Sequence, residues 1–187
     1  MFFGGRKGSR AVSFKTPRLY NSIKDPYKRS NSVSLEFTPN TAIIVALELF
    51  RESLHTGRDD LVQRSGQNLL NILNETFGID SEVELVIRGN RPARRKVDPN
   101  TGKKRIIAST HGKYYPARSA IALYTLTSTG RRVAYKTLLN TLVHEFCHHM
   151  DYKHPLLMLQ RSLHTKGFYE RLNSIYAPLK DLSLIHI

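Results

Sequence analysis

The chain has little cysteine and no long apolar run. One cysteine in 187 residues excludes an internal disulfide framework and any zinc ribbon built from four cysteines. The longest apolar run, residues 42–50, is interrupted by Glu48 and is much shorter than the roughly 20 residues of a membrane span. The first 20 residues contain no apolar stretch that would form a signal-peptide core. We therefore expect a soluble, cytoplasmic protein with no membrane partner, in a compartment that keeps its thiol reduced.

Acidic residues are also scarce, and the basic excess is unevenly distributed. The chain has 29 Lys and Arg against 15 Asp and Glu, a net charge of +14. Residues 1–30 contain eight basic residues and one acidic residue, residues 88–118 contain ten and one, and the remainder is nearly neutral. Two concentrated basic segments predict a polyanionic partner, DNA or another nucleic acid, bound through its phosphates. The alternative is a solvated tail and a solvated loop without a partner.

The second basic segment supplies the candidate nucleic-acid-binding residues. Tyr114 and Tyr115 lie within it, beside Lys113 and Arg118, and could stack on exposed bases. The candidates for phosphate contacts are Arg91, Arg94, Arg95, Lys96, Lys103, Lys104 and Arg105. Binding through them would also associate this cytoplasmic protein with DNA.

Hydrophobic periodicity and turn residues divide the chain into an N-terminal arm, one domain and a tail. We predict a flexible basic arm over 1–35, a domain over 36–180 and a tail of unknown role over 181–187. The predicted helices are 41–53, 59–78, 133–152 and 165–176, and the predicted strands are 82–88, 105–109 and 119–127, with a long basic connection over 89–103. This order, two helices followed by a small three-stranded sheet and two further helices, indicates an α+β fold.

The helix predicted over 133–152 carries the residues His144-Glu145-Phe146-Cys147-His148. Positions four apart return to the same side of a helix, so His144 and His148 can hold one zinc ion. Glu145 can then reach a water molecule on the metal and act as the catalytic base. The apolar stripe of this helix lies on the opposite side and consists of Leu139, Leu142, Val143, Phe146 and Met150.

A catalytic zinc needs a third protein ligand, and His164 is the favoured candidate. Thr165 can cap the last helix, which Phe168, Leu172 and Ile175 anchor to the core, so the preceding imidazole is held in place. His154 is the rival, because its spacing matches the metzincin pattern, although Asp151 stands where that pattern has Gly.

The remaining polar residues near this helix are expected outside the ligand set. His149 points away from His148, and Cys147 is interpreted as a buried structural thiol. Asp151 either accepts a hydrogen bond from a ligand imidazole or caps the helix.

The segments LVHEFCHHMDY and SLHTKGFYERL resemble the SprT-like (Spartan-type) zinc metallopeptidases. The resemblance covers roughly residues 80–178. It implies a zincin-like domain with an H-E-x-x-H active-site helix, zinc ligands His144, His148 and His164, and Glu145 as the catalytic base. Some members of that family cleave proteins crosslinked to DNA, a substrate class that the two basic segments would suit.

The sequence thus predicts a zinc-dependent metalloendopeptidase that hydrolyses protein or peptide substrates and could act on DNA-associated proteins. The strand Ala120–Thr127 could bind the substrate as an added edge strand. The candidates for the oxyanion stabiliser are Tyr152, Tyr169 and Arg171. The alternative is a non-catalytic nucleic-acid-binding protein with a structural zinc site, closed by His149 or His154 as a fourth ligand.

Overall fold

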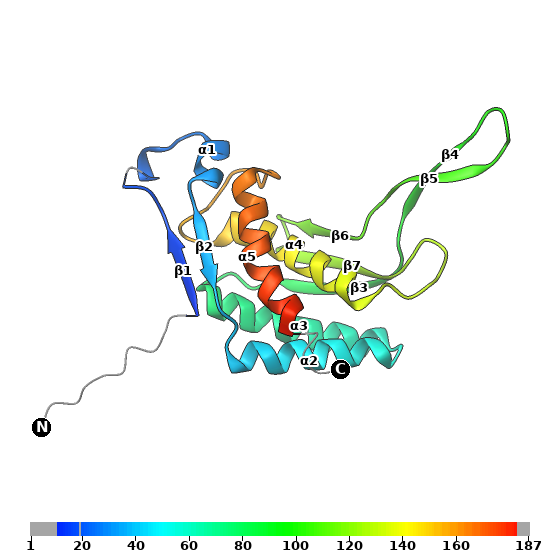
Figure 1. Ribbon diagram of the computed structural model, residues 1–187, viewed down its shortest axis with the longest axis horizontal. Helices are drawn as coiled ribbons and strands as arrows, with labels where there is room; N and C mark the ends of the chain where they lie inside the picture. The colour runs from blue at the N-terminus through cyan, green and yellow to red at the C-terminus, as the bar shows by residue number, and fades with distance from the viewer. Residues whose placement is uncertain (1–10, 19, 183–187) are drawn as a thin grey trace, which may run out of the picture.

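A computed structural model describes residues 11–18 and 20–182 of the chain (Figure 1). The described part begins with strand β1 (Val12–Lys15), the short 3-10 helix η1 (Tyr20–Ser22), helix α1 (Pro26–Asn31) and strand β2 (Ser34–Phe37). The two strands pair antiparallel. The described residues of the range 1–35, predicted as a flexible arm, thus form strands and helices, and residues 1–10 lie outside the described part.

This basic segment is ordered because apolar side chains lie between its charges. Tyr20, Val33 and Leu35 are buried, and β2 packs against the last helix of the chain. The carboxylate of Asp25 caps α1 by accepting a hydrogen bond from the backbone N–H of Tyr27, at 2.8 Å. The Arg29 guanidinium lies 4.9 Å above the Tyr20 ring. Each apolar run is only a few residues long, so it gave no periodic signal.

The helices predicted over 41–53 and 59–78 are confirmed as α2 (Thr41–His55) and α3 (Asp59–Phe77). The Asn40 side chain caps α2 by accepting a hydrogen bond from the backbone N–H of Ile43, at 3.0 Å. Gly78 ends α3 in the left-handed conformation, with φ of 65°. The two helices pack against each other along one side of the molecule (Figure 1).

The predicted three-stranded sheet is present, but its third strand differs from the prediction. Strand β7 (Ala120–Leu126) lies in the centre, parallel to β3 (Glu84–Asn90) and antiparallel to β6 (Gly112–Tyr115). Residues 105–109, predicted as part of this sheet, belong to β5 (Lys104–Ser109), which pairs with β4 (Ala93–Val97) in a separate hairpin. All six β5 residues are exposed, whereas β6 contributes the buried Tyr114 to the core.

Helices α3 and α4 (Tyr135–Lys153) cover the same face of the sheet. Leu85 and Tyr114 both pair with Ile121, so their side chains share one face, and Leu85 abuts α3 at Gly66. Gly112 lies on the same face of β6, two residues before Tyr114, and is in contact with α4. The rings of Phe77 on α3 and Phe146 on α4 meet at 5.6 Å. This two-layer arrangement confirms the α+β prediction.

Helix α5 (Lys166–Leu182) packs on α4 and β2. It continues six residues beyond the predicted end at Tyr176, through Pro178, so residues 181 and 182 belong to a helix rather than to a tail. Residues 183–187 lie outside the described part. No helix of the described ranges combines the length and the apolar character needed to cross a bilayer.

Candidate metal centre

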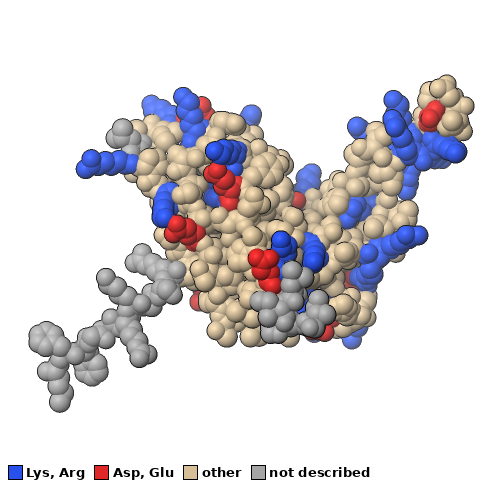
Figure 2. Space-filling view, in the orientation of Figure 1, with Lys and Arg blue, Asp and Glu red and all other residues tan. Residues whose placement is uncertain are grey.

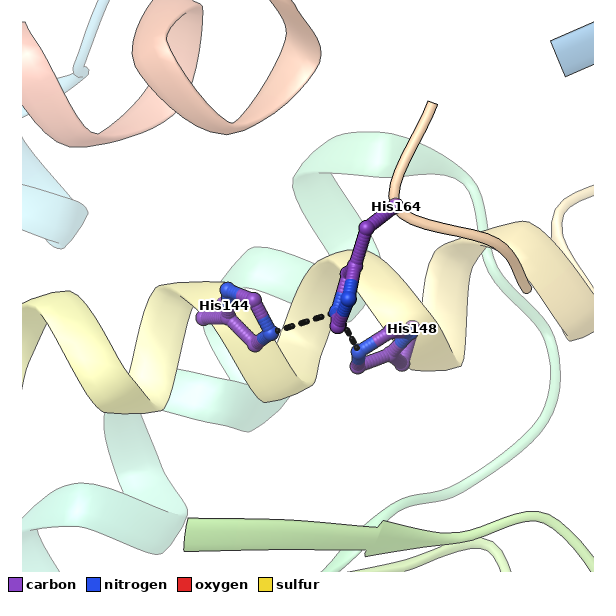
Figure 3. A group of neighbouring side chains, drawn as sticks. All are labelled: His144, His148 and His164. Carbon is purple, nitrogen blue, oxygen red and sulfur yellow. Dashed lines mark hydrogen bonds between the residues drawn. The ribbon is translucent and has the colours of Figure 1, made fainter. Parts of the chain in front are cut away.

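Helix α4 presents two histidines on the side opposite its buried stripe. The five predicted stripe residues are all fully buried. His144 and His148 lie on the other side of the helix, and His164 reaches them from the segment before α5 (Figure 3). The fold therefore brings the three predicted ligands together, although His164 lies 16 residues after His148 in the sequence.

The three imidazoles converge through the same ring atom. The Nε2 atom of His164 lies 3.0 Å from that of His144 and 3.1 Å from that of His148. Zinc–nitrogen bonds of about 2.0–2.1 Å in a tetrahedral site place the nitrogens roughly 3.3 Å apart. Among the described His, Cys, Asp and Glu residues, these three form the group that could hold a metal ion. Three imidazoles at this spacing suit a metal ion that binds nitrogen ligands.

Burial keeps two of these imidazoles in the form that binds metal. Desolvation lowers the pKa of His148 to about 3, with the neighbouring imidazoles His144 and His164 adding to the effect. Desolvation and His164 also lower the pKa of His144. Both rings are neutral at pH 7, which leaves a lone pair for coordination.

A hydrogen-bonded chain fixes the orientation of His148. The Ser162 hydroxyl donates to Oδ2 of Asp151 at 2.7 Å, so the same hydroxyl oxygen accepts from Nδ1–H of His148 at 2.6 Å. A proton on Nδ1 leaves Nε2 free to bind a metal. Asp151, expected either to orient a ligand imidazole or to cap the helix, thus orients His148 indirectly through Ser162.

Asp151 is in turn held by a fully buried ion pair. Nη2 of Arg171 lies 2.8 Å from Oδ1 of Asp151, and neither side chain is exposed. The guanidinium also donates to the backbone carbonyls of Ser30 and Val33 and to the Ser30 hydroxyl. The N-terminal segment, predicted to be flexible, is therefore linked through Arg171, Asp151 and Ser162 to the candidate ligand His148.

The start of α5 holds His164 in place. The Thr165 hydroxyl accepts a hydrogen bond from the backbone N–H of Phe168 at 3.1 Å, so Thr165 caps the helix as predicted. The predicted anchors Phe168, Leu172 and Ile175 are buried. The backbone N–H of Gly167 donates to the Asn31 side chain at 2.8 Å. A Cβ atom at Gly167 would lie 2.3 Å from the Ser30 carbonyl oxygen, so only glycine permits this contact.

Glu145 faces the cleft beside the imidazoles and is itself mostly buried. Its Oε2 accepts a hydrogen bond from the backbone N–H of Tyr114 on β6, at 2.7 Å. Desolvation raises the pKa of Glu145 to about 7, although the Tyr114 hydrogen bond opposes the shift. Strand β6 approaches α4 closely at Gly112, where a Cβ atom would lie 2.6 Å from Thr141 and 3.1 Å from Glu145. A carboxyl group with a pKa near neutrality can both accept and release a proton.

The metal centre opens into a cleft of about 550 Å³. Its lining includes the three histidines and Glu145, with β6 and residues 109–111 along one wall. Strand β6 is the edge strand at this wall, because β7 lies between β3 and β6. The prediction that Ala120–Thr127 binds substrate as an edge strand is therefore wrong, since that strand already pairs on both sides.

Other predicted residues lie outside the metal group. His149 is buried, with Nδ1 3.1 Å from the Tyr114 hydroxyl and Nε2 3.1 Å from the Ser81 carbonyl oxygen. His154, the rival third ligand, is buried with its ring centroid 4.2 Å from that of Phe14. Cys147 is a fully buried thiol, as expected, and burial raises its pKa.

The structure separates the three oxyanion candidates. Tyr152 lines the cleft. Arg171 is fully buried in its ion pair with Asp151, so it cannot reach a substrate. Tyr169 is 46% exposed, and its ring centroid lies 5.9 Å from that of His164.

Sequence reasoning missed Ser162, Gly112 and the backbone N–H of Tyr114. Ser162 precedes His164 by two residues in an irregular segment, so no periodicity marks it. Gly112 and Tyr114 act through the close approach of β6 to α4, and the strand had not been predicted. The expectation that Tyr114 stacks on bases is wrong, because its side chain is buried against His149.

The seven predicted phosphate-binding residues fall into two groups. Six lie on the β4–β5 hairpin or its turn and are exposed: Arg94, Arg95, Lys96, Lys103, Lys104 and Arg105. Arg91 lies instead at the base of the hairpin, with its Nη1 3.0 Å from Nε2 of His111. Burial lowers the pKa of Arg91.

Comparisons of the chain with protein-family models, curated proteins and solved structures find no match.

Proposed function

We propose that the protein is a zinc-dependent metallopeptidase with a zincin-like active site, as the SprT-like resemblance implies. The observation that carries the proposal is the convergence of the Nε2 atoms of His144, His148 and His164 beside Glu145 in an open cleft. Three protein ligands and an open fourth position are typical of catalytic zinc, whereas structural zinc sites have four protein ligands.

In this proposal, His144, His148 and His164 hold the zinc ion. A bound zinc would lower the pKa of its water and polarise the scissile carbonyl group. Glu145 takes the proton from the water and delivers it to the leaving amine. The Tyr114 N–H holds the Glu145 carboxylate through Oε2, which orients it toward the cleft.

Strand β6 is proposed to align the substrate. It is short, it forms an edge of the sheet, and Gly112 to Tyr114 line the cleft next to Glu145. An extended peptide could add to this edge through main-chain hydrogen bonds and place a peptide bond at the metal. Tyr152 is the proposed oxyanion donor, since it lines the same cleft.

The alternative function, a closed structural zinc site, is less consistent with the geometry. It requires His149 or His154 as a fourth ligand. Both side chains are buried in other contacts, with Tyr114 and Ser81 for His149 and with Phe14 for His154. The DNA-associated substrates implied by the resemblance remain part of the proposal, but nothing in the cleft itself selects them.

The test is hydrolysis of quenched fluorescent casein by the zinc-loaded chain, with bound zinc measured in parallel. Glu145→Gln should retain about one zinc per chain and lose cleavage, because the amide cannot accept the proton. Glu84→Gln removes an exposed carboxylate from β3 and serves as the matched control, which should cleave as the wild type does. Cleavage by the Glu145→Gln variant at the wild-type rate would refute the proposed base.

A further inference from the structure

The β4–β5 hairpin extends away from the body of the molecule as a ribbon of two strands (Figure 1). All six residues of β5 and the last four of β4 are exposed. A hairpin of two strands is marginally stable on its own, and packing against a further surface stabilises it. Because these strand residues are exposed, both faces of the ribbon are accessible to a partner.

The ribbon is strongly cationic. Residues 93–109 contain six Lys and Arg and one acidic residue, Asp98. The Asp98 carboxylate accepts hydrogen bonds from the backbone N–H groups of Asn100 and Thr101 in the turn. Within the described ranges, none of the six cations forms an ion pair with a carboxylate. Figure 2 shows these cations gathered along the projecting arm.

The strand register distributes the cations over both faces and adds apolar side chains to one of them. Lys96 pairs with Arg105 on one face, and Val97 pairs with Lys104 on the other. Ile106, opposite Arg95, lies on the same face as Val97. Val97 and Ile106 are 50% and 47% exposed, although they are apolar residues on a highly charged ribbon. The partner of this face must therefore offer both anions and apolar surface.

We propose that the β4–β5 hairpin is an arm that lies in the major groove of double-stranded DNA. The major groove of B-DNA is about 12 Å wide and admits a two-stranded ribbon. Phosphates line both edges of the groove, within reach of the long side chains of Arg95 and Lys104, which lie on the same face as Val97 and Ile106. Val97 and Ile106 then face the groove floor, where thymine methyl groups offer apolar contacts.

The base of the arm is continuous with the wall of the cleft. Only Thr110 and His111 separate β5 from β6, and Ser109 to His111 line the cleft. The contact between Arg91 and His111 lies at this junction. DNA on the arm would therefore lie beside the cleft. Binding to the arm itself does not depend on the proposed peptidase activity, so the two proposals can fail separately.

The first experiment measures binding of a 20-base-pair DNA duplex by fluorescence anisotropy over a range of salt concentrations, with chelator present. Each phosphate contact contributes about 0.9 to the slope of log K against log salt. Arg95→Gln with Lys104→Gln, on the face that enters the groove, should lower that slope by about two. The control, Arg64→Gln with Lys166→Gln, removes the same charge from exposed positions on α3 and α5, outside both basic segments, and should leave the slope unchanged. Equal losses in both double variants would overturn the proposal.

The second experiment tests the groove. The B-DNA duplex should bind more tightly than single-stranded DNA or an RNA duplex of the same length, because the major groove of A-form RNA is too narrow to be read. Ile106→Ser should weaken binding to DNA by about fivefold through lost apolar contact, with the salt slope unchanged. Equal or tighter binding of either other nucleic acid would contradict an arm that fits the major groove. Circular dichroism should show the same fold for every variant, since the substituted side chains are exposed.

Discussion

The three-histidine site and the base of the β4–β5 hairpin line the same cleft, yet the ion pair that supports the site is buried and the cations of the hairpin are exposed. At the metal centre, Arg171 and Asp151 are fully buried, and their hydrogen bonds lead through Ser162 to a ligand imidazole. On the hairpin, the cations are exposed and have no ion-pair partner among the described residues. The comparison indicates that the fold itself orders the side chains that could hold a metal, whereas the hairpin cations would be ordered only by a bound partner.

The largest expected effect is loss of metal from the three-histidine site. His164→Ala leaves two ligands, so zinc affinity should fall by more than the roughly 10–100-fold that follows loss of an orienting partner. His154→Ala is the control, because that side chain lies outside the group and packs on Phe14. Its stability should fall while its bound zinc remains about one per chain. Metal analysis after dialysis measures both, and zinc loss from the His154 variant alone would reverse the ligand choice.

The next largest effect is on the free energy of unfolding. Replacing an arginine by methionine should lower it much more in the buried network than on the hairpin. Arg171→Met leaves the Asp151 carboxylate buried without its partner, which should lower the free energy of unfolding by about 3–5 kcal/mol. Arg95→Met on the hairpin should change it by about 0.5 kcal/mol or less, since the side chain is exposed. Denaturant unfolding of the metal-free proteins measures the difference. Similar values for both variants would remove the contrast.

A smaller effect is expected at Ser162, which links the buried network to the metal. Ser162→Ala removes the acceptor for Nδ1–H of His148, so zinc affinity should fall by roughly 10–100-fold. Ser162→Thr keeps a hydroxyl group and should recover most of that affinity. Competition with a zinc chelator measures both variants. Unchanged affinity in Ser162→Ala would show that His148 is oriented without the hydroxyl.

Removing the arm should have the smallest effect on zinc affinity and cleavage. Replacing residues 94–108 with Asn-Gly should leave zinc affinity and casein cleavage within about twofold of the wild type, because the deleted side chains are mostly exposed. Binding to the DNA duplex should be lost in the same protein. A large loss of zinc would show that the hairpin supports the metal centre, against the proposed division between the two regions.

The helix that carries the histidine pair was the part most accessible to prediction. A periodicity of 3.6 residues determines both the apolar stripe of α4 and the direction of His144 and His148. His164 could be predicted because Thr165 and Phe168 mark the start of an anchored helix.

Strand pairing could not be predicted from local sequence. Residues 105–109 have the composition of a strand and do form one, but composition does not specify the partner, and β6 occupies the expected place in the sheet. The N-terminal segment was not recognised as part of the domain because its apolar residues lie scattered between charges and show no periodicity, although Tyr20, Val33 and Leu35 are buried in the core. Ser162 contributes through its hydrogen bonds with His148 and Asp151, for which the sequence has no signal.

X-ray absorption of the zinc-loaded chain tests the central claim most directly, because it counts the atoms bound to the metal. Three histidine ligands and an open position predict a first shell of three nitrogens at about 2.0–2.1 Å and one oxygen from water. A shell of four imidazole nitrogens, or a sulfur from Cys147 at about 2.3 Å, would contradict the proposed centre.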